Sequence, residues 1–244
     1  MTQLIRRIAF YLCSSNIFSL LGFAQARDVS ARFTAAFLAF SFTAAAQPTH
    51  WVASWAASPA PPLSDPAALR SEGLEFDNET VREIVHLSIG GPVLRVRFSN
   101  LFGGQSLEIV GAHIALRAQD SAIAASSDRR LTFGGAPGIS IPANAVVYSD
   151  LVKLDVPAGS DLAVSIFLSH TTLASGIHYF AHQTSYVGPG DLTAAPSLKQ
   201  PRKISSWVFL AGVDVSAPPE VAAPRRRPSR AAARRARAGA PDLR

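Results

Sequence analysis

A length of 244 residues, of which 48% are apolar, allows one domain or one and a half with a real hydrophobic core. The formal net charge of +6 suggests nucleic-acid binding, but the positive charge lies at the two ends. Residues 221–244 hold eight Arg and one Asp, and residues 1–46 hold four Arg and one Asp, which leaves residues 47–220 with a net charge of −4. A basic nucleic-acid-binding face on this central segment is therefore not supported.

The only cysteine of the sequence is Cys13. A single cysteine excludes a disulfide within one chain and any metal site built from several thiolates. Cysteine usage leaves the cellular compartment open, because many exported proteins lack disulfides.

Two consecutive export-signal patterns occupy the amino terminus. The first runs from Arg6 to Ala26 and the second from Arg32 to Ala46, and each has a basic start, an apolar run and an Ala-x-Ala end. We predict cleavage after Ala46, so that residues 1–46 form a signal or leader region of a secreted or periplasmic protein. Neither apolar run reaches the roughly 18–20 residues of a spanning helix, so no stable membrane span is expected.

Residues 47–216 carry few helical signals and many turns rich in Gly, Pro, Asn and Asp. Leu94, Val96 and Phe98 alternate with Arg95 and Arg97, which predicts a half-buried strand with a solvated arginine face. Strands are predicted over residues 82–89, 93–100, 107–116, 130–133, 138–142, 146–154, 162–168, 183–187 and 206–215.

The short, evenly spaced strands predict an all-β fold, an antiparallel β-sandwich of the jelly-roll kind. The first two strands are expected to pair as a hairpin across Gly90-Gly91. Residues 99–104 are expected to form a turn after the second strand, with Asn and Gly taking positive φ values. In the strand over residues 107–116, Val110 and Ala112 are expected on the same apolar face.

Six sequence blocks follow one another between residues 51 and 215. They are WVASWAASP at 51–59, RVRFSNLFG at 95–103, LTFGG at 131–135 with Ser149-Asp150, VPAGSDLAVS at 156–165, QTSY at 183–186 and WVFLAGVDV at 207–215. In this order they resemble the N-terminal region of bacterial secreted SGNH/GDSL-type hydrolases, the esterase and lipase group.

The resemblance implies a Gly-Asp-Ser block with the nucleophile soon after Val213-Asp214-Val215, and later blocks with the oxyanion hole and an Asp-x-x-His pair. This sequence contains no Gly-Asp-Ser; Gly190-Asp191-Leu192 is the nearest string and has no hydroxyl at its third position. No Gly-x-Ser-x-Gly elbow occurs either. No catalytic residue, cofactor or metal ligand is therefore assigned, and the chain is predicted to be a non-catalytic domain that is inactive alone. The ester substrate of an intact relative stays open: a lipid, an acetylated sugar or another ester.

Residues 217–244 are rich in Arg, Ala and Pro and almost lack large apolar residues, so no packed core is expected there. We interpret this tail as a frameshift that replaces the nucleophile block, with the missing catalytic domain as the natural partner. The alternative is a basic arm that binds an anionic surface.

Histidine-based sites are disfavoured by the sequence. His178 and His182 are four residues apart, but Tyr179-Phe180-Ala181 between them is not helical in pattern, so a metal pair is not expected. A triad of His182 with Ser185 and Asp191 is disfavoured as well, because closeness in sequence does not establish geometry.

Three aromatic residues, Trp51, Trp55 and Tyr186, are the candidates for ligand contact. Exposed together they would form a platform for sugar rings, which makes a secreted carbohydrate-binding β-sandwich the alternative function. The simpler interpretation is that they pack in the core or against a second domain. A third interpretation is a poorly folding fragment whose domain-facing surface is left bare.

Overall fold

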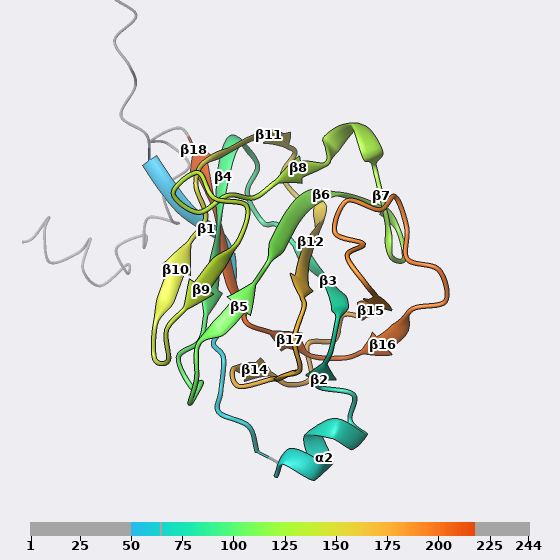
Figure 1. The fold of residues 1–244 in the computed structure, drawn as a ribbon. Helices are drawn as coiled ribbons and strands as arrows, with labels where there is room; N and C mark the ends of the chain where they lie inside the picture. Colours follow the sequence, from blue (N-terminus) through green and yellow to red (C-terminus); the bar gives the residue numbers. More distant parts are fainter. Residues whose placement is uncertain (1–49, 64, 218–244) are drawn as a thin grey trace, which may run out of the picture. The chain divides into compact units, whose positions relative to one another are not determined.

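The computed structural model of the protein describes residues 50–63 and 65–217. The predicted leader and the tail from residue 218 onward lie outside the described residues. The predicted all-β antiparallel sandwich is confirmed: two main sheets carry most of the described chain (Figure 1). Within the described residues, no helix is long and apolar enough to cross a membrane.

The five-stranded sheet contains β1 (His50–Ala56), β18 (Leu210–Ala217), β4 (Gly91–Ser99), β10 (Val146–Tyr148) and β11 (Val152–Val156). Its order is β1-β18-β4-β10, with β11 also pairing to β4, and all of these pairs are antiparallel.

The seven-stranded sheet contains β16 (Arg202–Ile204), β15 (Ser185–Pro189), β3 (Glu79–His86), β12 (Asp161–Leu168), β6 (Gly111–Gln119), β7 (Ala122–Ile123) and β8 (Arg129–Arg130). Its order is β16-β15-β3-β12-β6-β7, with β8 also pairing to β6.

Short two-stranded ladders and one helix complete the described fold. The ladders join β2 (Glu75–Phe76) to β13 (Thr172–Leu173), β14 (Ile177–His178) to β17 (Trp207–Val208), and β5 (Leu107–Ile109) to β9 (Ile139–Ile141). Helix α2 (Pro66–Ser71) begins after Asp65, whose side chain accepts a hydrogen bond from the Ala68 amide, with proline at the first helical position. A 3-10 turn spans Ala125–Ser127.

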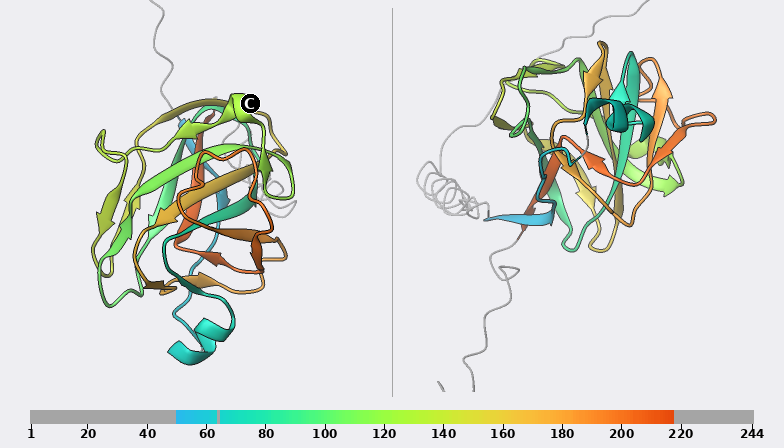
Figure 2. Two further views of the ribbon diagram at one scale, coloured as in Figure 1. Left: turned by 45° about the vertical axis from the view of Figure 1, so that its right-hand side comes forward. Right: turned by 90° about the horizontal axis from the view of Figure 1, so that it is seen from below.

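The core lies between the two main sheets, and burial alternates along β4 and β11 of the five-stranded sheet. Leu94, Val96 and Phe98 of β4 are fully buried, whereas Arg95 and Arg97 lie on the outer face, as predicted. The inward residues of β12 join the same cluster: Leu162, Val164, Ile166 and Leu168. The view from below, on the right of Figure 2, shows β1 and β18 side by side on one side of this core. Apolar side chains that point inward from both sheets form the one shared core of a sandwich, although β3 and β12 are also covered on their outer face.

The predicted hairpin across Gly90-Gly91 is wrong, because β3 and β4 belong to different sheets. The two glycines lie where the chain passes from one sheet to the other, in close contact with the backbone of other strands. A Cβ atom on Gly90 would overlap the Val156 carbonyl oxygen, and one on Gly91 would overlap the Ser216 carbonyl oxygen. The glycines therefore serve close backbone approach rather than a two-residue turn.

The predicted strand over residues 107–116 is divided at Val110 into β5 and β6. Val110 is 46% exposed and does not share the buried face of Ala112 and Ile114. The strand predicted over residues 146–154 is likewise divided, into β10 and β11. The first break occurs where the chain changes partner strand, from β9 to β12, whereas β10 and β11 pair with two different parts of β4. Alternation of apolar residues reports neither change.

Asp150 holds together two of the blocks that carry the family resemblance. Its carboxylate accepts hydrogen bonds from the Thr132 hydroxyl at 2.7 Å, the Gly135 amide at 2.8 Å and the Gly134 amide at 2.9 Å. The Thr132 bond, followed by the two glycine amides, lowers the pKa of Asp150. Gly134 and Gly135 have φ values of 59° and 83°, which glycine adopts without strain. The Leu-Thr-Phe-Gly-Gly block is thus a turn fixed by the Ser-Asp block.

Asn100 organises the turn that follows β4. Its side-chain amide donates to the carbonyl oxygens of Gln105 at 2.8 Å and Ile141 at 2.9 Å, and its own oxygen accepts from the Ser175 hydroxyl. Gly103 packs directly on this side chain, where a Cβ atom would overlap the Asn100 amide oxygen. The predicted turn is confirmed, but neither Asn100 nor Gly103 adopts a positive φ. The lack of room for a Cβ atom, and not a positive φ, therefore explains why residue 103 is a glycine.

Glu83 is a carboxyl group inside the core. The side chain is 1% exposed, and its Oε1 accepts a hydrogen bond from the Val208 amide at 2.5 Å. The neighbouring Trp207 donates its indole N–H to the Ile84 carbonyl at 2.8 Å, so β17 is attached to β3 by two adjacent bonds. Burial raises the pKa of Glu83 well above its usual range, and the Val208 bond opposes this only in part.

We predict that Glu83→Gln stabilises the protein at pH 8 by on the order of 1 kcal/mol or more, with a difference that shrinks toward pH 4. Above the unfolded-state pKa, the unfolded chain has lost the Glu83 proton that the folded chain retains, so wild-type stability falls as pH rises toward the folded-state pKa. Glutamine is neutral and keeps an acceptor for Val208. Urea unfolding of both proteins at several pH values measures the difference. A constant difference across this range would contradict the assignment.

Candidate functional site

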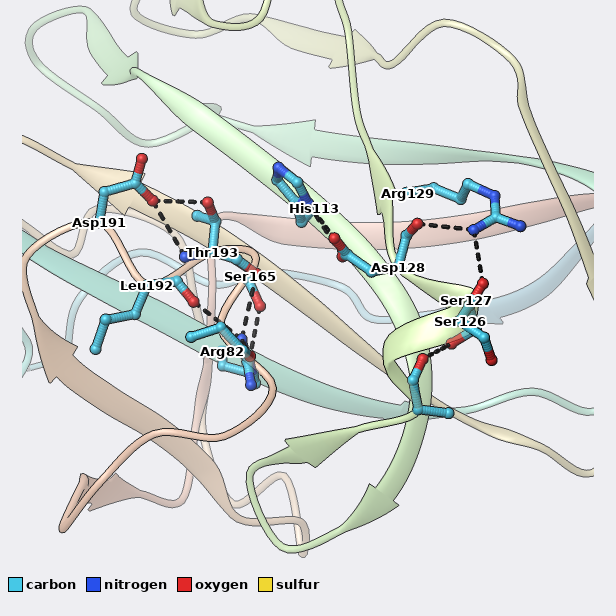
Figure 3. A network of polar contacts seen from close by, with 12 residues as sticks. Arg82, His113, Ser126, Ser127, Asp128, Arg129, Ser165, Asp191, Leu192 and Thr193 are labelled. Atoms are coloured by element: carbon cyan, nitrogen blue, oxygen red, sulfur yellow. Dashed lines mark hydrogen bonds and ion pairs between the residues drawn. The ribbon is translucent and has the colours of Figure 1, made fainter. Parts of the chain in front are cut away.

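The outer face of the seven-stranded sheet carries a cluster of polar side chains, which we call the polar cluster. Its members come from β3, β6, β12 and the segments that follow β7 and β15, and they are Arg82, His113, Asp128, Ser165, Asp191 and Thr193 (Figure 3). Buried hydrophobic residues beside them, among them Ile84, Ala163 and Tyr186, form a second hydrophobic cluster on the same face. This outer face is therefore covered rather than solvated.

Arg82 lies at the centre of the polar cluster and is completely buried. Its Nε donates to the Ser165 hydroxyl oxygen at 2.8 Å and its Nη1 to the Ser121 carbonyl at 2.6 Å. Its Nη2 donates to the carbonyl oxygens of Leu192 at 3.0 Å, Thr193 at 3.2 Å and Ala195 at 2.9 Å. One guanidinium thus attaches the segment after β15 to the sheet.

All five of these acceptors are uncharged. Burial lowers the pKa of Arg82 to about 10, and the negative charge of Asp128 opposes that shift. The guanidinium is still protonated at neutral pH, so its charge is spread over carbonyl dipoles instead of being neutralised by a carboxylate in contact. Arg82 therefore has the environment of a structural residue that fixes a covering segment.

His113 and Asp128 form a pair beside Arg82. The His113 Nδ1 lies 3.0 Å from both carboxylate oxygens of Asp128, and both side chains are mostly buried. In the neutral imidazole this contact places the proton on Nδ1, which leaves Nε2 as the acceptor. A histidine oriented in this way has the geometry of a general base.

A cavity of about 510 Å³ lies against this pair. His113, Arg130, Asp191 and Thr193 supply its polar wall, and Val110 is among its apolar residues. One oxygen of the Asp191 carboxylate is occupied within the protein, because Oδ1 accepts from both the amide and the hydroxyl of Thr193, at 3.1 and 2.6 Å.

The hydroxyl groups of the polar cluster are engaged in other bonds than one to His113. Ser165 lies opposite His113 across the β6–β12 ladder, but its oxygen accepts from Arg82. Thr193 donates to Asp191, and Ser127 donates to the Ala124 carbonyl at 2.6 Å. Within residues 50–63 and 65–217, His113 thus has an orienting carboxylate but no hydroxyl bonded to it, so the arrangement lacks the nucleophile of a triad.

The disfavoured triad of His182, Ser185 and Asp191 is not assembled. Ser185 is buried in β15 and its hydroxyl has no hydrogen-bond partner, whereas His182 is exposed. Asp191 is bonded to Thr193, as described above. His178 bonds through Nδ1 to the Ser58 carbonyl at 3.1 Å. In the part of the chain that the structure describes, no group of three or more His, Cys, Asp or Glu side chains could hold a metal ion.

The three candidate aromatics do not share one surface. Trp51 lies on the outer face of the five-stranded sheet, where the Arg95 guanidinium sits 4.8 Å from its ring and 4.3 Å from the Tyr148 ring. Trp55 packs edge-on against Trp207 at 4.9 Å, beside the core. A sugar platform that combines Trp51 and Trp55 with Tyr186 is therefore not available.

Tyr186 lies in the other layer and is only 3% exposed. Its place in β15 puts it among the residues covered by the segment after that strand. Tyr186 and Trp55 therefore pack against the hydrophobic clusters, which agrees with the simpler interpretation from the sequence.

Arg82, the residue that organises the polar cluster, is not among the candidate residues predicted from the sequence. The available signal was a charged pair, Arg82-Glu83, between the apolar residues Val81 and Ile84-Val85 of one strand. A strand buried on both faces places one of two adjacent charges in each layer, and each then needs its own acceptor or donor. The covering segment that supplies the acceptors carries no recognisable motif.

A scan against protein-family models finds no match for this chain, and a search of the curated proteins finds none either.

We predict that Arg82→Met destabilises the protein by about 3–5 kcal/mol, because it leaves several buried carbonyl groups without a donor. The matched control is Arg130→Met, at an exposed arginine of the same sheet, which is expected to change stability by less than about 0.5 kcal/mol. Urea unfolding measures both variants. Hydrogen exchange of the amides at residues 190–198 locates the effect, and unchanged protection there would contradict the role assigned to Arg82.

Proposed function

We propose that residues 47–216 form a non-catalytic β-sandwich domain of an exported ester hydrolase of the SGNH/GDSL kind, and that this chain does not hydrolyse esters by itself. The observation that supports the proposal is the use of the family-like blocks as scaffold. Their polar residues bond to one another or to nearby backbone groups.

Three of these blocks illustrate the point. Asp214 of the Val-Asp-Val strand accepts two hydrogen bonds from Arg95, at 2.9 and 3.0 Å. Asp150 is saturated by the turn at residues 132–135, and Asn100 by the carbonyl groups around it. A domain built in this way supports or positions a partner domain, which on this proposal is the catalytic domain encoded by the same gene.

Two histidines of the described residues are bonded to a carboxylate, His113 to Asp128 and the more exposed His86 to Asp161, and no hydroxyl group is bonded to either imidazole. General-base geometry without an activated hydroxyl or an oxyanion hole does not produce an acyl-enzyme. The proposal therefore makes the His113–Asp128 pair a structural contact between β6 and the segment before β8.

We predict that the purified full chain shows no turnover of p-nitrophenyl acetate or butyrate above buffer, and no covalent labelling by a fluorophosphonate. A known serine esterase in the same assay serves as the positive control, and the His113→Ala variant as the matched negative control. Turnover that disappears in His113→Ala would assign the base to this pair and overturn the proposal.

The family assignment has a separate test at the DNA level. We expect that translation of the gene in all three frames beyond codon 210 yields a frame with a Gly-Asp-Ser block. Absence of such a block from every frame would contradict the assignment while leaving the fold unchanged.

A further inference from the structure

The outer face of the five-stranded sheet carries a groove at the end of β1 that is separate from the polar cluster. Its volume is about 550 Å³, within the range of roughly 300–1,000 Å³ that is usual for small-molecule sites. Arg97 supplies the charge, and the apolar lining includes Ala57, Pro59, Leu101 and Val146.

Arg97 is held flat against the sheet. It lies opposite Gly212 of β18, where a Cβ atom would come within 2.9 Å of Nη2. Nη2 donates to the Ala211 carbonyl at 2.9 Å, and Nη1 lies 3.4 Å from the Tyr148 hydroxyl. The glycine allows the guanidinium to lie across β18, and these two contacts fix it there, with further N–H groups left for a ligand or water.

The charge of Arg97 is not compensated by an acidic side chain. Among the residues that the structure describes, none forms an ion pair with it. Its neighbour on the same face, Arg95, is paired with Asp214 at 2.9 Å, so that carboxylate is already occupied. One arginine of β4 is thus neutralised, and the other offers its charge to the groove.

The walls of the groove suit a saturated hydrocarbon. Leu101 is 41% exposed and Val146 is 45% exposed, and the other apolar lining residues are alanines and a proline. The described lining contains no aromatic ring, so it offers no stacking face for a sugar or a base.

We propose that this groove binds an aliphatic carboxylate, the anion of a medium-chain or long-chain fatty acid. The carboxylate lies on the fixed guanidinium of Arg97, a pairing that two parallel N–H donors favour. The chain covers Leu101 and Val146 and removes their apolar surface from water. This binding site does not depend on the proposed function, since it needs only the described sandwich.

The test is titration of the full chain with dodecanoate below the concentration at which it forms micelles, followed by calorimetry. We expect saturable binding at one site per chain, with affinity falling about threefold to fourfold for each methylene that the groove no longer buries. Dodecanol, which has the same chain without the charge, is expected to bind at least about tenfold more weakly. Equal affinity for the two would overturn the proposal.

Two variants separate the charge from the chain contact. Arg97→Gln is expected to weaken dodecanoate binding by about tenfold or more and to leave dodecanol unchanged. Leu101→Ser, at an exposed position where folding is little affected, is expected to weaken both ligands. Arg130→Gln removes the same charge from an exposed arginine of β8 and is the matched control.

Circular dichroism of each variant establishes that it is folded. If Arg97→Gln and Arg130→Gln weaken dodecanoate binding equally, the effect comes from net charge alone and the proposed site is wrong. Absence of saturable dodecanoate binding would overturn it as well. Binding to phosphatidylglycerol vesicles without binding of dodecanoate would assign this face to a membrane surface instead.

Discussion

Strands β3 and β12 are buried on both faces, and this constraint governs the structure of the described domain. Their inward side chains meet the five-stranded sheet, and their outward side chains meet the segment that follows β15. Polar groups in such strands must find partners inside the protein, because water does not reach them. Arg82 points to the outer face and donates to the segment after β15, whereas Glu83 points to the inner face and accepts from β17. Each residue thereby attaches a separate segment to β3. The covering segment depends on Arg82, and β17 depends in part on Glu83.

The same rule explains why the family-like blocks do not form a reactive centre. Asn100 and Asp150 of these blocks lie just after β4 and β10, where free backbone groups need a partner. Asp150 accepts hydrogen bonds from the amides of a tight turn, and Asn100 bonds to the carbonyl groups of two segments and to the hydroxyl group of a third. Polar residues of this kind are fully occupied by the fold. This supports a scaffold role for the domain, which is the basis of the function proposed above.

Arg95 and Arg97 show how tertiary neighbours give different properties to residues with the same place in a pattern. Both lie on the outer face of β4, two residues apart. Arg95 sits between two aromatic rings and faces Asp214, whereas Arg97 faces Gly212 and has no acidic partner among the described residues. Alternation predicted one solvated face for both arginines, but the structure gives each of them a different environment. Only the second leaves a charge available to a ligand.

The sequence by itself determined the fold class and the burial of β4, because alternation of apolar and polar residues reports directly which face a strand presents to the core. It also located the turn at Asn100 and the absence of a Gly-Asp-Ser block. Tertiary structure decided which strands pair. Gly90-Gly91 connects two sheets instead of two neighbouring strands, since close approach to Val156 and Ser216 is a long-range contact. It likewise decided the roles of Arg82, Arg97 and Tyr186, whose partners lie far away in the chain. Local patterns specify the face of a residue, but what covers that face is fixed only when the sheets stack.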